Sequence, residues 1–238
     1  MISLFPCLND NYGLLLHEPE SGLTASIDAP DAGAISKACA ARGWILTHIF
    51  NTHHHYDHVG GNLALKEKYG VTIVGPEADE ARIPGIDVAL EDGAVFTFGA
   101  FKIEVLHTPG HTKGHCAYYV PAQNSVFVGD TLFALGCGRL FEGTAAQMFD
   151  SIAKLAQLPD ETKVYCAHEY TLSNGAFAIS ANPENEALKA YIEEAKALRA
   201  QGLPTVPTTI GREKTANPFM RAATPEILGD IRAAKDRF

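Results

Sequence analysis

The chain has 238 residues, of which 46% are hydrophobic and 20% are charged, and its formal net charge is -9. This balance predicts a globular protein that can bury a full hydrophobic core. The negative charge argues against nucleic acid as a general partner, because phosphate binding depends on clustered Lys and Arg. A net negative charge still allows the chain to bind a small anionic ligand through a few local Lys or Arg side chains.

The N-terminal segment and the cysteines indicate a cytoplasmic protein. The first Lys of the chain is Lys37, so the start lacks the basic region of a secretory signal or transit peptide. No apolar run reaches membrane-spanning length. The five cysteines, at positions 7, 39, 116, 137 and 166, include no Cys-x-x-Cys pair, which favours reduced thiols over a disulfide framework. We therefore expect a cytoplasmic protein with no membrane contact. We also expect a monomer, although nothing in the cysteine pattern bears on that expectation.

Short strands alternate with helices over roughly the first 170 residues. The strand-like runs are short, rich in β-branched or aromatic residues and bounded by Gly, Pro, Asn or Asp. They cover residues 14–17, 24–29, 47–50, 71–74, 95–105 with a break near Gly99, 118–120, 125–128 and 163–167. Helices are predicted over 32–42, 62–69 and 145–157, where Gly or Pro provides the stop signal.

The last third of the chain has a different character. A helix is predicted over residues 188–200, followed by an extended stretch over 204–218. A final helix should begin at Thr224-Pro225, with Thr as the N-cap and Pro at the first helical position. We expect a mixed αβ catalytic domain at residues 1–172 and a helical C-terminal domain at residues 173–238.

The segment NTHHHYDHVGG, from Asn51 to Gly61, places four imidazoles and one carboxylate within six residues. These groups are ligands that zinc and other first-row metals accept. His53 and His55 lie two residues apart just after a strand, so both rings can face one ion. Asp57 and His58 lie where the chain turns toward a helix, and they could reach a second ion beside the first.

Three further candidates for metal binding, His111, Asp130 and His168, each follow a strand-like run. Loops at strand ends are where a sheet scaffold usually places its chemistry. His54 and Tyr56 alternate with the candidate ligands, so their side chains should point away. The remaining histidines, at positions 17, 48, 107 and 115, are expected to be structural, with His115 a candidate for orienting a ligand.

These elements in this order resemble the metallo-β-lactamase superfamily: His-x-His-x-Asp-His, then HTPGH at 107–111, then Gly-Asp, then a late His. The resemblance implies an αββα sandwich with metals at one sheet edge, and therefore an α+β fold. It also implies a site for two divalent metals. One would be held by His53, His55 and His111 and the other by Asp57, His58 and His168, with Asp130 and a hydroxide bridging them.

Within that superfamily the chain resembles the glyoxalase II, or hydroxyacylglutathione hydrolase, family over nearly its whole length. Three segments carry the resemblance: GCGRLFEGT at 136–144, AHEYT at 167–171 and the tail IRAAKDRF at 231–238. The implied contacts to glutathione come from Arg139, Phe141, Tyr170, Arg232 and Lys235. Some family members have Tyr where this chain has Phe141, so one hydroxyl contact is absent here.

The resemblance implies hydrolysis of S-D-lactoylglutathione and other S-2-hydroxyacylglutathiones to glutathione and the hydroxy acid, the second step of methylglyoxal detoxification (EC 3.1.2.6). A bound metal lowers the pKa of water from 15.7 to about 7, so no Ser or Cys nucleophile is required. Asp57 and Asp130 are the catalytic candidates, because they would hold and orient the bridging hydroxide. Zinc is the expected metal, with iron or manganese as alternatives.

Two other interpretations are compatible with the metal motif alone. One is a different superfamily enzyme, such as a lactonase, a β-lactamase or a glutathione persulfide dioxygenase with a single iron. The tail and the Gly-Cys-Gly-Arg loop at 136–139 argue against it. The other is a metal-dependent binding module without catalysis. The presence of a suitable residue at every ligand position argues against it.

Overall fold

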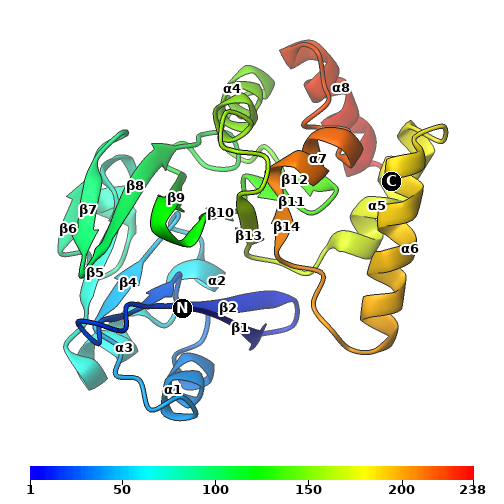
Figure 1. The fold of residues 1–238 in the computed structure, drawn as a ribbon. Coiled ribbons are helices and arrows are strands. Elements are labelled where there is room, and N and C mark those ends of the chain that lie inside the picture. Colours follow the sequence, from blue (N-terminus) through cyan, green and yellow to red (C-terminus); the bar gives the residue numbers. More distant parts are fainter. The chain divides into compact units, whose positions relative to one another are not determined.

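The computed structural model describes residues 1–238, and they form two compact units (Figure 1). The first unit comprises residues 1–107 and 114–127, and the second comprises residues 108–113 and 128–238. The boundaries of these units differ from the domain boundary expected at residue 172. That domain boundary stays a prediction.

The first unit contains a six-stranded sheet in the order β1-β2-β3-β4-β5-β6. The first three strands are antiparallel and the others run parallel to β3. The strands are β1 (Ile2–Cys7), β2 (Asn11–His17), β3 (Thr24–Ile27), β4 (His48–Phe50), β5 (Thr72–Pro76) and β6 (Val88–Leu90). The residues that follow β3, β4 and β5 therefore lie along the same edge of the sheet.

A second, antiparallel set of strands in the first unit packs against this sheet. It contains β7 (Val95–Phe98), β8 (Phe101–His107), β9 (Cys116–Val120) and the start of β10 (Ser125–Gly129). The ring of Phe50 on β4 lies edge-on to Phe96 and Tyr118, with ring centroids 5.2 and 5.4 Å apart. Interleaved aromatic rings thus form the centre of a two-sheet sandwich.

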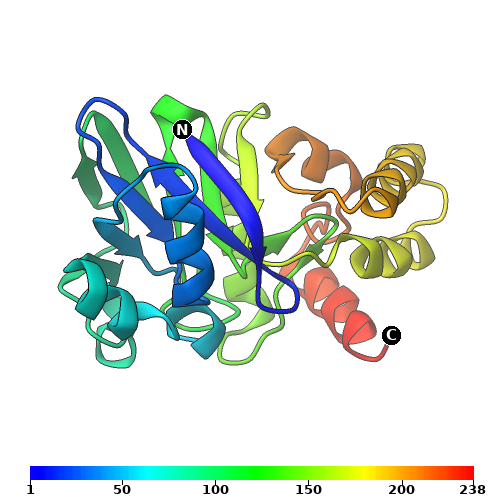
Figure 2. The same cartoon turned by 90° about the horizontal axis from the view of Figure 1, so that it is seen from below.

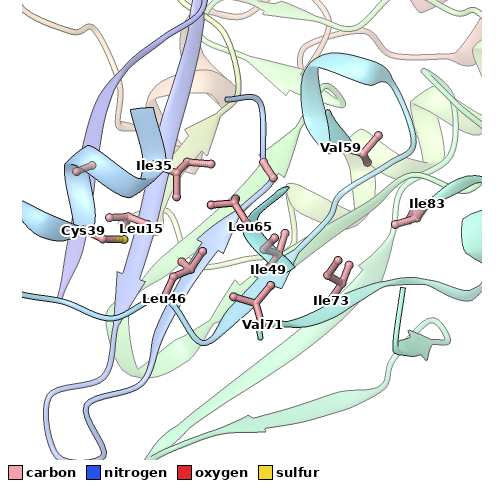
Figure 3. Packing of buried hydrophobic residues seen from close by; sticks show 12 residues of the cluster. Leu15, Ile35, Cys39, Leu46, Ile49, Val59, Leu65, Val71, Ile73 and Ile83 are labelled. Carbon is pink, nitrogen blue, oxygen red and sulfur yellow. The ribbon is translucent and has the colours of Figure 1, made fainter. Parts of the chain in front are cut away.

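Two helices cover the other face of the first sheet, α1 (Ala32–Ala40) and α3 (Asn62–Tyr69) (Figure 2). Asp31 caps α1 by accepting a hydrogen bond from the Ala34 amide at 2.6 Å. Gly70 ends α3 in the left-handed conformation that glycine adopts without a steric penalty. Their apolar residues pack with the sheet residues Leu15, Ile49 and Ile73 (Figure 3).

The short elements of the first unit are the helix α2 (Tyr56–Val59) and two 3-10 turns, η1 (Glu77–Arg82) and η2 (Pro121–Gln123). No helix of the structure combines the length and apolar character that a membrane span requires.

The second unit holds the end of β10, the strands β13 (Lys163–Cys166) and β14 (Thr208–Thr209), and a hairpin of β11 (Leu132–Phe133) and β12 (Gly136–Cys137). Its helices are α4 (Ala145–Leu155), α5 (Thr171–Ala181), α6 (Glu186–Ala200), α7 (Ile210–Ala216) and α8 (Pro225–Asp236). Figure 1 shows α5 beside α6, and these helices share a cluster around Leu188 and Ala178. A second cluster joins α4 and α8 through Met148 and Leu228. The α+β class with a helical C-terminal region is thus confirmed.

The prediction of an extended stretch over residues 204–218 is wrong for its second half, because that half contains α7. Thr209 caps this helix by accepting a hydrogen bond from the Arg212 amide at 3.2 Å. Its inner face buries Ile210, Glu213 and Ala216. Apart from Thr215, the Pro and Thr residues that favoured an extended chain lie outside these seven helical positions.

Candidate metal centre

The segment with the metal motif follows β4 and is held rigidly by Asn51. The Asn51 amide donates to the Val74 carbonyl at 2.8 Å, and its side-chain Nδ2 donates to the His58 carbonyl at 2.9 Å. The Tyr118 hydroxyl donates to the Asn51 carbonyl at 2.6 Å. Strand β4 is parallel to its neighbours, so this turn projects from the sheet edge.

Within the first unit the four predicted ligands of this motif lie together. The ligand atoms of His53 lie within 4.8 Å of those of His55 and of His58, and the same limit holds between Asp57 and His58. His53 Nε2 lies 3.0 Å from His55 Nδ1, and His58 Nε2 lies 3.5 Å from Asp57 Oδ2. The spacing of the motif thus brings three imidazoles and one carboxylate to one place.

A residue that the sequence analysis missed, Asp28, orients His58. Its buried carboxylate contacts His58 Nδ1 at 2.8 Å and accepts hydrogen bonds from the Thr52 amide at 2.7 Å and the Thr52 hydroxyl at 2.9 Å. Nδ1 is thereby occupied, so Nε2 is the nitrogen that faces the other ligands. Contacts of this kind fix the tautomer and direction of metal-binding histidines.

Asn11, at the start of β2, plays a similar part for Asp57. Its Nδ2 donates to Asp57 Oδ2 at 3.1 Å and to the Asp57 carbonyl at 3.3 Å. The available signal for both missed residues was their position. Asn11 begins an apolar strand, and Asp28 directly follows β3, the strand beside β4, after which the motif begins.

The spacer residues of the motif behave as predicted, and one of them has a defined partner. His54 Nδ1 lies 2.9 Å from Asp79 Oδ2, and Arg82 contacts the other oxygen of the same buried carboxylate. Tyr56 is 81% exposed. His115 is buried with its ring centroid 4.9 Å from that of His53, next to the ligand cluster.

In the second unit the other three predicted ligands also lie together. Asp130 contacts His111 Nε2 through Oδ2 at 3.5 Å and His168 Nε2 through Oδ1 at 3.4 Å. All three side chains are buried. Asp130 therefore presents one carboxylate oxygen to each imidazole.

The surroundings of His111 and His168 fix the directions of both rings. His111 Nδ1 lies 2.9 Å from the Arg139 carbonyl, which directs Nε2 toward Asp130. The ring of Tyr170 stacks on that of His168 at 4.8 Å with an interplanar angle of 1°. The ring of Phe141 lies edge-on to His111 at 5.2 Å.

The donor chemistry of both clusters fits divalent metals. Nitrogen-to-oxygen separations of 3.4–3.5 Å are longer than ordinary N–H···O hydrogen bonds of 2.7–3.2 Å, and they suit donors arranged around a shared cation. The outward-facing Nδ1 atoms of His58 and His111 are held by a carboxylate and a carbonyl. The chain thus carries His/Asp clusters able to hold metal.

The predicted glutathione contacts differ in exposure. The Arg139 side chain is 68% exposed with its Nε 3.8 Å from Asp236, and Phe141 is also exposed. Arg232 is buried, and its guanidinium donates to the Cys137 carbonyl at 2.8 Å and contacts Asp236 at 3.0 Å. Arg232 thus fastens α8 to the loop of Arg139, a structural role that the sequence did not predict.

Lys235 lies one turn from Arg232 on α8 and contacts the Asn174 side-chain oxygen. Burial, followed by the nearby Arg232 charge, lowers the pKa of Lys235 to about 8. Its ammonium is therefore partly desolvated, which strengthens any contact that it makes with an anion.

No cysteine offers a thiolate at neutral pH. Burial raises the pKa of all five thiols, to about 11 for Cys7 and Cys137 and to about 12 for Cys166. Thiols of this kind are inert as nucleophiles.

Comparison with known proteins assigns both parts of the chain. The family model of the metallo-beta-lactamase superfamily matches residues 40–168, and that of the hydroxyacylglutathione hydrolase C-terminus matches residues 169–238. The crystal structure of ETHE1 from Myxococcus xanthus has a TM-score of 0.75 and 27% identity, covering 98% of this chain and 90% of that one. The fold and site thus define a member of the metallo-β-lactamase superfamily, as the sequence predicted.

Two relatives narrow this class. The hydroxyacylglutathione hydrolase of Maricaulis maris is 51% identical over 100% of this chain and 98% of its own length. That of Brucella anthropi is 53% identical over 100% of this chain and 96% of its own length. The chain belongs to the hydroxyacylglutathione hydrolase family.

Proposed function

We propose that the protein hydrolyses glutathione thioesters, with S-D-lactoylglutathione as the prototype, releasing glutathione and D-lactate. The observation that carries the proposal is the complete donor set: five of the seven donors are buried, and outer contacts fix the rings of His58 and His111. Relatives that match over the full length of this chain are named hydroxyacylglutathione hydrolases, which supports this activity.

The seven donors are proposed to hold two divalent cations, with zinc expected and iron or manganese as alternatives. One set is His53, His55 and His111, the other is Asp57, His58 and His168, and Asp130 serves both. When bound, such cations lower the pKa of water to about 7 and polarise a carbonyl group. The inert thiols support this choice, because the chain offers no cysteine nucleophile.

The chain's own residues would then position the reactants. Asp57 and Asp130 hold and orient the attacking oxygen, and Asn11 keeps the Asp57 carboxylate in place. Arg139 and Lys235 are proposed to bind the carboxylates of glutathione, and Tyr170 to donate a hydrogen bond to its peptide backbone. Phe141 packs on the ligand, and Arg232 is proposed to bind a glutathione carboxylate as well as to hold the Arg139 loop.

The other expectations from the sequence remain predictions: the domain boundary at residue 172, the cytoplasmic location and the monomeric state. We infer that the helical C-terminal residues 173–238 serve substrate binding, because Arg232 and Lys235 lie on α8.

The test combines metal analysis with a substrate panel of S-acylglutathiones, lactones, a β-lactam and glutathione persulfide. We expect two metals per chain and preferential turnover of the hydroxyacylglutathiones. Asp130→Ala should abolish turnover and lose at least one metal, whereas the exposed Asp150→Ala should change neither. Full metal content with normal turnover in Asp130→Ala would refute the bridging role, and preference for a lactone would refute the substrate.

A further inference from the structure

Helix α7 and its C-cap residue carry a buried polar pair, Glu213 in the helix and Asn217 at the cap, that the proposed chemistry does not use. The Glu213 carboxylate is fully buried and accepts hydrogen bonds from four donors. They are the Leu135 amide at 2.9 Å, Asn217 Nδ2 at 2.9 Å, the Tyr191 hydroxyl at 3.0 Å and the Thr208 hydroxyl at 2.7 Å. A carboxylate with four donors is well satisfied despite its burial, so its position is fixed.

Both residues of the pair hold the β11–β12 hairpin. Asn217 Nδ2 contacts the Phe133 carbonyl at 3.1 Å and the Gly136 carbonyl at 3.0 Å. Glu213 takes the amide of Leu135, which lies at the turn with φ of 59°. A leucine in this left-handed region is unusual and persists only where its surroundings impose it. The pair therefore determines the conformation of the hairpin.

The residues that directly follow the hairpin contact two of the proposed metal ligands. Gly138, the residue after β12, packs so closely that an added Cβ would lie 2.0 Å from the Asp130 carbonyl and 3.1 Å from His111 Nδ1. The Gly138 amide donates to the Thr131 carbonyl at 3.3 Å. Arg139 then places its carbonyl 2.9 Å from His111 Nδ1. A shift of the hairpin would therefore move the group that orients His111.

We propose that Glu213 and Asn217 are positioning residues for metal binding, acting on His111 through the β11–β12 hairpin and the Arg139 carbonyl. The helical C-terminal region then has a second role besides binding glutathione. This inference rests on the proposed metal site, because it requires that His111 be a ligand. The effect should be on metal affinity as well as on substrate binding, since the same loop carries the Arg139 side chain.

The test is Asn217→Ala, which removes the contacts to both hairpin carbonyls. Metal affinity is measured by competition with a chromogenic chelator, using zinc alone, and substrate kinetics are measured separately. We expect zinc affinity to fall by about ten-fold, at the lower end of the range for residues that orient metal ligands. KM for S-D-lactoylglutathione should rise several-fold when zinc is saturating.

Two further variants separate positioning from loss of stability. Leu155→Ala opens a cavity in the buried face of α4, so it should lower the melting temperature without changing zinc affinity. Tyr191→Phe removes one donor to Glu213 but none of the hairpin bonds, and should leave zinc affinity within two-fold.

The possible failures are distinguishable. If the wild-type protein binds no zinc, the proposed metal site itself fails. If the wild-type protein binds zinc and Asn217→Ala binds it equally well, the positioning role is overturned. Equal losses of zinc affinity in Asn217→Ala and Leu155→Ala would also overturn it, because they would show an effect of stability alone.

Discussion

His58 and Asp28 form a buried pair, with Nδ1 2.8 Å from Oδ2 and both residues no more than 5% exposed. The other carboxylate oxygen of Asp28 accepts a hydrogen bond from the Thr52 amide. One side chain after β3 therefore fixes both the start of the metal motif and one of its ligands. The residue has a positive φ of 58°, so the backbone is bent to bring the carboxylate there.

We expect Asp28→Asn to weaken metal binding, because an amide carries no charge and can present a donor to Thr52. Changes to carboxylates that orient metal-binding histidines typically cost 10–100-fold in metal affinity or activity. The measurement is zinc affinity by chelator competition, with turnover at saturating zinc alongside.

Asp31→Asn is the matched control for this prediction. Asp31 caps α1 by accepting a hydrogen bond from the Ala34 amide. Asn is an N-cap of similar strength, so the substitution should change stability by less than about 1 kcal/mol and leave zinc affinity unchanged. An Asp28→Asn variant with wild-type zinc affinity would contradict the orienting role.

The candidate metal ligands of the motif could be proposed from sequence because their chemistry is local. His53, His55, Asp57 and His58 are close in the chain, and strand geometry brings His53 and His55 to one face. Most strands and helices were also predictable from periodicity and stop signals, and α3 begins and ends at the predicted residues.

The residues that support the ligands were not predictable in the same way. Asn11 and Asp28 contact residues 46 and 30 positions away, and neither belongs to a motif. Helix α7 was missed because its stability comes from the buried Glu213 and its cap, not from a long amphipathic pattern. The burial of Arg232 depends on tertiary packing, which a short charged tail does not reveal.

His54 and Asp79 should be energetically coupled, because the imidazole contacts a fully buried carboxylate that Arg82 also contacts. In a double-mutant cycle of His54→Ala and Asp79→Ala, urea unfolding should give a coupling free energy of about 0.5–3 kcal/mol. A control cycle of His54→Ala with Asp150→Ala should be additive. Additive behaviour of the first pair would show that the contact does not stabilise the loop.

Gly138→Ala should impair the site, because the new Cβ would lie 2.0 Å from the Asp130 backbone carbonyl, which cannot move without moving the ligand. We expect a loss of zinc affinity together with lower turnover. Gly229→Ala on α8 is the control, since its Cβ would meet only the Ala145 side chain at 3.1 Å. Equal effects of the two substitutions on zinc affinity would argue against a special role for Gly138.

Lys235 should make substrate binding depend on pH. Burial and the nearby Arg232 lower the pKa of Lys235 from 10.5 to about 8, so the ammonium loses its proton as the pH rises through that value. If the ammonium binds a glutathione carboxylate, KM for S-D-lactoylglutathione should rise between pH 7 and pH 9. Lys235→Arg should abolish that rise, because a guanidinium stays charged.

The stability of the free protein should increase as the pH rises from about 8 toward 10.5, whereas substrate binding weakens with rising pH. Because the folded pKa of Lys235 lies below the unfolded value, the cost of burying the ammonium is fully present below about pH 8 and is relieved as the pH rises toward 10.5. Lys235→Met should therefore stabilise the free protein at pH 7 more than at pH 10, as measured by urea unfolding. The exposed Lys189→Met serves as the control and should show no such difference. If KM of the wild-type protein does not depend on pH but this stability change is observed, Lys235 affects only the stability of the fold and does not bind the substrate.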